Sequence, residues 1–257
     1  MLSRGRVRVN GKACRIASRL VEAGDMIEIG RKPIPVTKAF DLEIVWEDPA
    51  LVVVYKPPGI LTVSTLHERE RTVHSLLRRH LRTRNPRQNV FVVHRLDKFV
   101  SGLLVFAKSE RIQQELKKLF ARHAIERRYW AVVEGRIEKD RGTIRSRLVE
   151  EQNMRVRSTG DERKGKLAIT HYRVLRRLPN LTTLEVTLET GRKNQIRVHL
   201  AELKHPIAGD KAYGSRINPL GRLALHAFCL GFSHPAQGTP LYFKTDPPPE
   251  FRPYLPG

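Results

Sequence analysis

The order of strand-like and helix-like segments is the feature of this sequence that most limits the folds open to it. Helical spacing of apolar residues follows Thr72 and Ser109, two residue types suited to an N-cap, and recurs over 194–204. Apolar runs typical of strands occupy residues 42–46, 51–55, 90–93, 103–107, 129–133 and 184–188. Because these segments do not alternate as regular βαβ units, they predict an α+β fold, with helices flanking a mixed, mostly antiparallel central sheet.

Two prolines divide the chain into a short basic segment and a larger domain. Pro33 and Pro35 interrupt any helix or strand ladder, so residues 31–38 are predicted to form a linker. Before them, the run 6–29 has the alternation and turn residues of a strand-turn-strand segment. We therefore expect a small N-terminal appendage over 1–36 and the main domain over 40–257. Within the main domain, the polar stretch 150–166 is predicted to be a mobile basic loop.

The chain carries a large excess of positive charge, with 48 Lys and Arg against 26 Asp and Glu and a net charge of +22 at pH 7. Hydrophobic residues make up 40% of it, which excludes a disordered basic tail. Because each Lys or Arg that meets a phosphate releases counterions, nucleic acid is the expected partner. The sequence has neither an apolar run of about 18 residues nor a secretory leader, so we expect a cytoplasmic protein without membrane attachment.

One loop between two predicted strands concentrates reactive side chains. His94, Arg95 and Asp97 lie between the runs 90–93 and 103–107. A loop held by strands on both sides fixes its side chains at a strand end, where binding and catalytic sites are commonly built. Taken alone, however, Asp97 is better explained as a member of a surface ion pair, which adds only about 0 to 1 kcal/mol of stability.

The same loop resembles the motif of a known family. His94-Arg95-Leu96-Asp97, followed by Ser101-Gly102-Leu103-Leu104, resembles the HRLDxxTSGLL signature of the RluA-type pseudouridine synthases, with Val100 in place of the usual Thr. Further segments resemble family motifs in the family's order: 56–62 (KPPGILT), 127–135 (RRYWAVVEG), 190–200 (TGRKNQIRVHL), 209–214 (GDKAYG) and 222–235 (RLALHAFCLGFSHP). Lys193-Asn194 replace a more typical Thr-His pair. The resemblance covers nearly all of 42–246, and the N-terminal segment is similar to the later half of an S4 RNA-binding module.

The resemblance implies a pseudouridine synthase catalytic fold with a small S4-like N-terminal appendage. It also implies a reaction, the isomerisation of uridine in RNA to pseudouridine, in which the C1′–N1 bond breaks and a C1′–C5 bond forms. Asp97 would be the essential carboxylate, and Tyr129 and Arg197 the other catalytic residues. Asp97 could stabilise positive charge at C1′, attack the sugar or the base, or remove a sugar proton, and the sequence does not choose among these routes. Candidates for binding the flipped nucleotide are Arg95, His94, Leu200 and Arg192.

The resemblance further implies action on RNA without a small-molecule cofactor, on ribosomal RNA in the first place and on transfer RNA in the second. We expect the protein to be a monomer. Basic side chains expected to contact the RNA are Arg6, Arg8, Lys12, Arg78, Arg79 and Arg82. The histidines 94, 199, 226 and 234 lack the spacing of metal ligands, so no metal is expected. Two other functions stay open: a non-catalytic RNA-binding or ribosome-assembly protein on the same scaffold, and a glycosidic-bond hydrolase, which commonly uses two carboxylates.

Overall fold

A computed structural model of the chain describes residues 7–9, 12–14, 23–24, 26–29, 42–66, 68–152 and 154–256, with the backbone alone for the first two ranges. The chain divides into two compact units, Met1–Asp41 and Leu42–Gly257. In the first unit, β1 (Val7–Val9), β2 (Lys12–Cys14) and β3 (Ile27–Ile29) form an antiparallel sheet in the order β2-β1-β3. The strand β2 is an addition to the predicted strand-turn-strand pattern, and the predicted linker lies outside the described residues.

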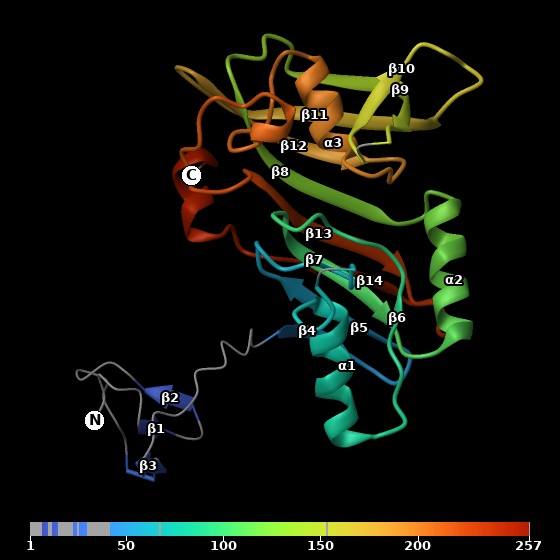
Figure 1. Cartoon of the computed structure of the whole chain (residues 1–257), viewed down its shortest axis with the longest axis vertical. Coiled ribbons are helices and arrows are strands. Elements are labelled where there is room, and N and C mark those ends of the chain that lie inside the picture. Colours follow the sequence, from blue (N-terminus) through green and yellow to red (C-terminus); the bar gives the residue numbers. More distant parts are fainter. Residues whose placement is uncertain are drawn as a thin grey trace. The chain divides into compact units, whose positions relative to one another are not determined.

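A single mixed sheet runs through the described part of the second unit (Figure 1). Its strands are β4 (Glu43–Glu47), β5 (Leu51–Lys56), β6 (Phe91–Val92), β7 (Ser101–Ala107), β8 (Glu126–Glu134), β9 (Arg141–Glu150), β10 (Val156–Thr159), β11 (Lys166–Leu178), β12 (Leu181–Leu188), β13 (Leu225–Ser233) and β14 (Pro240–Lys244). The main path is β10-β9-β11-β12-β8-β13-β7-β5-β4, while β14 pairs with β13 and β6 with β7. Among the described pairs of strands in this sheet, only β7 with β13 is parallel, which confirms the predicted mostly antiparallel sheet.

In the described residues, three α-helices flank this sheet: α1 (Val73–Arg84), α2 (Glu110–Ala121) and α3 (Gln195–Glu202). As predicted, the Thr72 and Ser109 side chains cap the first two helices by accepting a backbone N–H three residues on. The third helix is shorter than predicted, because Lys204 adopts a left-handed conformation (φ 66°) that ends it. Short 3-10 turns follow at Lys211–Tyr213 and Pro249–Tyr254. No helix in the described part of the chain is long and apolar enough to cross a membrane.

The core is built on strands that are buried on both faces. All seven residues of β7 are buried, and β5 is buried at every position except Tyr55. These strands pack against α2 through Leu51, Leu103, Ile112 and Leu116. Because both of their faces lie in the core, they read as continuous apolar runs rather than as alternating patterns. They form the rigid support for the loop that carries Asp97.

The predicted basic loop over 150–166 is partly a strand, which corrects the sequence analysis. Residues Val156–Thr159 form β10 and pair antiparallel with the end of β9. Val156 is buried and packs with Leu148 and Val198, so one apolar residue anchors the strand on α3. A single buried side chain in a polar stretch leaves too weak a pattern for a strand to be predicted.

Gly102 is expected to tolerate no side chain. Its φ is +119°, and a Cβ there would lie 2.1 Å from the Ala227 carbonyl oxygen on the parallel neighbour β13. Because both the left-handed backbone and the contact with main-chain atoms oppose a methyl group, Gly102→Ala should lower the free energy of unfolding by about 3 kcal/mol or more. Urea unfolding would measure this loss. Gly160→Ala is the control, since that position has open space around it, and an equal loss in the two variants would contradict the prediction.

Candidate active site

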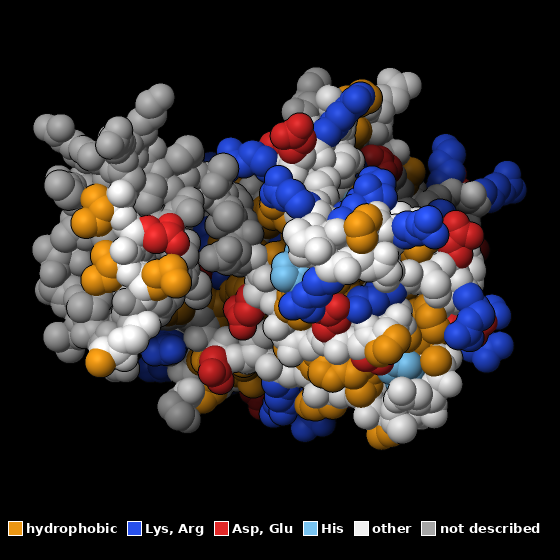
Figure 2. All heavy atoms as spheres, turned by 90° about the horizontal axis from the view of Figure 1, so that it is seen from below, with side chains coloured by type: hydrophobic (Ala, Val, Ile, Leu, Met, Phe, Trp, Pro, Cys, Tyr) orange, Lys and Arg blue, Asp and Glu red, His pale blue; other side chains and the backbone are white. Residues whose placement is uncertain are grey.

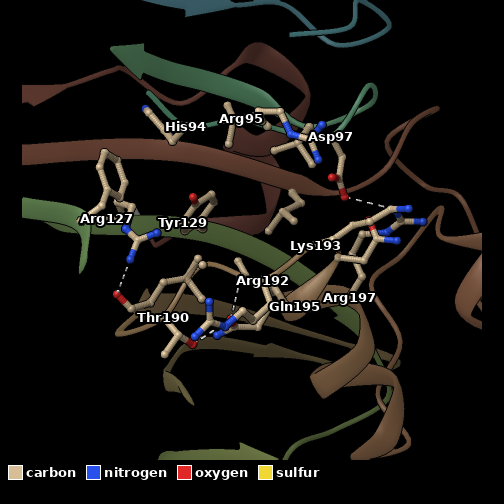
Figure 3. A pocket seen from close by; sticks show the side chains of 18 of the residues that line it. His94, Arg95, Asp97, Arg127, Tyr129, Thr190, Arg192, Lys193, Gln195 and Arg197 are labelled. Carbon is tan, nitrogen blue, oxygen red and sulfur yellow. Dashed lines mark hydrogen bonds and ion pairs between the residues drawn. The ribbon is translucent and has the colours of Figure 1, made fainter. Parts of the chain in front are cut away.

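A cavity of about 690 Å³ opens where the loop before β7 faces β8 and the loop between β12 and α3. Asp97, Tyr129 and Arg197 all line it, although they are far apart in sequence (Figure 3). Asp97 comes from the loop after β6, Tyr129 from the middle of β8, and Arg197 from the first turn of α3. The structure therefore brings the three residues proposed as catalytic into one cavity.

Asp97 and Arg197 form an ion pair at the wall of this cavity. Arg197 Nη1 donates to Asp97 Oδ2 at 3.2 Å, and the Asp97 side chain is 34% exposed. The other edge of the guanidinium binds Asp210 through Nε and Nη2, at 2.7 and 2.8 Å, and that carboxylate is 2% exposed. Such a bidentate contact fixes the orientation of the guanidinium plane. Asp210 thus holds Arg197, which in turn holds Asp97.

Two further groups orient Arg197. Asn194 accepts a hydrogen bond from Arg197 Nη1 at 3.1 Å and donates one to the Tyr213 hydroxyl. The Tyr213 ring lies 4.8 Å from the guanidinium carbon. Burial alone would lower the pKa of Arg197, but Asp210 and Asp97 outweigh it and raise that pKa. The guanidinium therefore stays a cation at every pH at which the protein is folded.

The loop that carries Asp97 is tied to the rest of the domain by buried polar groups. Lys56 is fully buried at the end of β5, and its ammonium donates to the carbonyls of Pro57, Lys98 and Val100 at 3.0, 2.9 and 2.6 Å. On the other side of Asp97, the Thr62 hydroxyl donates to the Leu96 carbonyl at 2.7 Å. Because the backbone is held on both sides of Asp97, the carboxylate has little freedom to move away from Arg197.

Lys56 should give the protein a characteristic pH dependence of stability. Burial lowers the pKa of Lys56 from 10.5 to about 7, although the Asp97 charge opposes this change. Between these two values the unfolded chain binds a proton that the folded chain lacks, so the free energy of unfolding contributed by this group rises with pH. The free energy of unfolding of wild type minus that of Lys56→Met should rise by up to about 1.4 kcal/mol per pH unit between pH 7 and 10.5.

Urea unfolding between pH 6 and 10 would test this effect. Lys117→Met is the matched control, because Lys117 is an exposed residue of α2. For this control, the difference in free energy of unfolding from wild type should not change with pH. Parallel stability profiles for wild type and Lys56→Met would contradict the prediction.

Tyr129 forms part of the floor of the cavity. Only 6% of the residue is exposed, and burial raises the pKa of its hydroxyl, while nearby Arg127 acts in the opposite direction. The hydroxyl therefore stays protonated near neutral pH and can donate or accept a hydrogen bond. The apolar residues Val100, Leu188, Ile196 and Leu225 also line the cavity. A flat base can stack between these groups and the tyrosine ring.

The loop between β12 and α3 is fixed by a network around Gln195, which is 2% exposed. Its side-chain oxygen accepts from the Thr190 hydroxyl and the Arg192 N–H, and its amide donates to Ile169 and Thr170 on β11. Arg127, 7% exposed, donates to the carbonyls of Leu188 and Glu189. These contacts set the wall that faces Asp97 and Tyr129.

Of the four residues proposed to bind the nucleotide, three line the cavity and one does not. Arg95 and Arg192 are exposed and line the cavity, and Arg192 Nε donates to the Leu167 carbonyl. His94 also lines it, but Nε2 accepts the Val105 N–H, and burial lowers the pKa of this histidine to about 3. Leu200 is fully buried and does not line the cavity, which corrects its proposed contact with the base. It follows Arg197 by about one turn of α3, and its side chain is buried in the core. Ile196 and Leu225 line the cavity in its place.

The departures from the family pattern have specific contacts here. Lys193 binds the Glu150 carboxylate and the Met154 carbonyl, which ties the cavity wall to the hairpin of β9 and β10. Asn194 takes up a left-handed conformation at the start of α3 and contacts Arg197, as described above. Sequence reasoning did not find Lys56, Asp210, Asn194 or Leu225 as site residues. The only signal was that all four fall within segments that resemble family motifs.

Three of the four histidines considered in the sequence analysis lie outside the cavity and have structural partners. His199 contacts Thr170 and Ser146, His226 contacts Ser101 and Thr245, and His234 contacts Asp48. Among the described residues, no three His, Cys, Asp or Glu side chains are grouped so as to hold a metal ion.

The basic residues proposed to bind RNA divide into two groups. Arg78, Arg79 and Arg82 are exposed on α1. Arg6 lies outside the described residues, and so do the side chains of Arg8 and Lys12.

The cavity offers one carboxylate for chemistry. Of the described residues that line it, Asp97 is the only acid, since Asp210 lies behind Arg197 and outside the lining. A hydrolase that works with two carboxylates around an admitted water would need a second acid facing the same space. The arrangement instead fits a reaction in which one carboxylate acts on a flat ring held against a tyrosine.

Comparisons with known proteins agree with this geometry. A family profile described as RNA pseudouridylate synthase matches residues 50–202, more than half of the chain. A Bacillus subtilis protein named uncharacterized RNA pseudouridine synthase YlyB is 37% identical over 95% of this chain and 82% of its own length. Ribosomal large subunit pseudouridine synthase D of Neisseria meningitidis serogroup A is 33% identical over 96% of this chain and 70% of its own length.

Solved structures show the same fold. Human RNA pseudouridylate synthase domain containing 4 matches with a TM-score of 0.68 and 24% identity, covering 82% of this chain and 92% of its own. Human RNA pseudouridylate synthase domain containing 1 matches with a TM-score of 0.66 and 25% identity, covering 82% and 85%. The family profile, the curated relatives and the fold all bear out the resemblance read from the motifs, and the chain therefore belongs to the RNA pseudouridine synthase family of enzymes.

Proposed function

We propose that this enzyme converts uridine to pseudouridine in the RNA of the large ribosomal subunit, with Asp97 as the essential carboxylate. The observation that carries the proposal is the position of Asp97, a lone acid in the cavity, fixed by Arg197 and facing Tyr129. Several relatives over most of the chain are named ribosomal large subunit pseudouridine synthase D, which supports ribosomal RNA as the substrate.

The reaction balances without any other reactant. The C1′–N1 bond of the uridine breaks, the uracil ring turns while it is held in the cavity, and C5 bonds to C1′. The proton on C5 leaves and N1 gains one, so product and substrate have the same composition. Asp97 can assist by attacking the sugar or base, by stabilising charge at C1′, or by removing a sugar proton.

The cavity walls would hold the base during this turn. The target nucleotide must leave its stack to reach a side chain of the protein, and enzymes that act on bases commonly flip them into a pocket. Tyr129 on one side and Leu225 on another offer the flat and apolar surfaces that a uracil ring needs. Arg95 is exposed at the rim, and its planar guanidinium is suited to stack in the gap that the flipped base leaves.

The test is release of tritium from RNA labelled at uridine C5, followed by separation of the nucleosides. Transcripts of large-subunit ribosomal RNA and of transfer RNA would be compared. We expect tritium release and pseudouridine from the ribosomal transcript. Free uracil would instead assign a hydrolase, binding without turnover would assign a non-catalytic RNA-binding protein, and turnover on transfer RNA alone would overturn the proposed substrate.

A further inference from the structure

One face of α1 carries arginines that the catalytic cavity does not use. Arg78, Arg79 and Arg82 recur at a spacing of three and four residues, which places them on the same side of the helix. The opposite side of α1 is buried through Val73, Leu77 and Leu81. Figure 2 looks at the molecule from below and shows Lys and Arg side chains spread over the coloured part of this surface, with some Asp and Glu side chains among them.

These arginines line a groove of about 630 Å³ together with Ser64, Arg69, His74, Ser75 and Thr83. None of the described residues that line it is acidic, and none also lines the catalytic cavity. The loop that carries Arg69 is fastened to the helix, because the Arg69 carbonyl accepts hydrogen bonds from the Ser64 and Ser75 hydroxyls at 3.1 and 2.8 Å. The groove is therefore a second basic site in the same unit.

Most of the positive charge in this groove has no partner among the described residues. Within the described part of the chain, the guanidinium groups of Arg69, Arg78 and Arg79 have no hydrogen-bond or ion-pair partner. Arg82 reaches only the Gln88 carbonyl and the Asn89 side chain, both at 3.4 Å. Arg84, outside the groove, pairs with Glu47. Because like charges at this helical spacing repel one another, the cluster calls for an anion from outside.

We propose that this groove binds backbone phosphates of the substrate RNA next to the target uridine. The identity of the anion as RNA rests on the proposed function. Arg78 and Arg82 start about 6 Å apart along the helix axis, and their long side chains extend this reach further. The row is therefore long enough to contact at least two successive phosphates, and guanidinium groups suit phosphate geometry.

The groove is connected to the catalytic cavity through the start of α1. The Val73 N–H donates to the Leu61 carbonyl, and the His74 N–H donates to the Thr62 carbonyl. The Thr62 hydroxyl in turn exchanges hydrogen bonds with the backbone of Leu96, the neighbour of Asp97. RNA bound to α1 is thus connected by these hydrogen bonds to the loop that carries Asp97. This connection would keep the target nucleotide at a fixed position relative to the carboxylate.

The test replaces Arg78, Arg79 and Arg82 together by glutamine, a good helix former. Binding of a fluorescent large-subunit ribosomal RNA fragment is measured by anisotropy over a range of KCl concentrations. The affinity should fall about tenfold or more near physiological salt, and the slope of log affinity against log salt should fall by about 2 to 3. In the tritium-release assay, KM should rise by the same factor by which the affinity falls, while kcat falls less than about threefold.

The matched control replaces Lys139, Arg141 and Arg252 by glutamine, which removes the same charge from residues that line neither space. Unchanged affinity and slope in the α1 variant would overturn the proposal, and so would an equal loss in the control. Unchanged RNA binding with lost binding of poly-glutamate would assign the groove to acidic proteins instead. If wild type binds RNA through the groove but modifies none, the proposed function fails, and the groove is left as an RNA-binding site without a target uridine.

Discussion

Replacing Asp97 by asparagine is expected to reduce tritium release from C5-labelled RNA by about a thousandfold or more. Asparagine has nearly the same shape, and its side-chain oxygen can still accept the Arg197 hydrogen bond seen at 3.2 Å. It lacks the negative charge that would attack the nucleoside, remove a proton or stabilise C1′. Equilibrium RNA binding should change less than about threefold, because affinity comes mainly from phosphate contacts that Asp97 does not make.

A control for the loss of one negative charge is Asp246→Asn, at an exposed position outside the cavity. Asp246→Asn should match wild type in turnover. Both Asp97→Asn and Asp246→Asn should match wild type in circular dichroism. Turnover of Asp97→Asn within about tenfold of wild type would remove Asp97 from its proposed role. Loss of RNA binding together with turnover would show that Asp97 acts in binding or folding rather than in the chemical step.

Replacing Arg197 by methionine should affect both stability and turnover. It leaves the Asp210 carboxylate, 2% exposed, without its bidentate partner. Removing one member of a buried ion pair costs about 3 to 5 kcal/mol, because the other charge stays buried and uncompensated. Asp97 also loses its ion pair, so turnover of the folded fraction should fall by about a hundredfold or more. Urea unfolding and tritium release measure the two effects.

A second change separates the stability effect from the catalytic one. In the Arg197→Met background, Asp210→Asn removes the buried uncompensated charge, so part of the lost stability should return. Turnover should stay low, because Asp97 still lacks its cation. Arg197→Lys keeps the charge but not the planar fork and should fall between wild type and Arg197→Met in both measurements. Recovery of turnover in the double variant would contradict the role given to Arg197.

Local sequence signals were sufficient for the elements with strong periodicity. The caps at Thr72 and Ser109 begin α1 and α2 as predicted, and the apolar runs 51–55 and 103–107 are β5 and β7. In these segments the pattern and the tertiary packing favour the same structure. The strand β10 was missed because one buried residue, Val156, anchors it on α3, and a single apolar side chain in a polar stretch forms no pattern.

Of the site, the sequence identified the proposed catalytic side chains but not the residues that hold them, nor Asn194 and Leu225, which also line the cavity. Asp97, Tyr129 and Arg197 lie in motifs, and the structure places them around one cavity. The buried Lys56 behind the Asp97 loop and Asp210 behind Arg197 lie within motif-like segments but give no further local signal, since a lysine near a turn and an aspartate after a glycine are common on surfaces. Leu200 is the opposite case. The sequence analysis proposed it as a residue that binds the nucleotide, but its side chain is buried in the core.

The amino-acid sequence by itself determined the class of fold, the order of motifs that identifies the family, the expected RNA partner and the residues proposed for chemistry. Only the tertiary structure decided which charges are paired: Arg197 lies between Asp97 and Asp210, Lys56 holds three carbonyls, and the α1 arginines share a groove without an acid. The physical reason is that periodicity and capping act over a few residues. Ion pairs and buried hydrogen bonds between distant residues depend instead on strand register and packing, which no local pattern specifies.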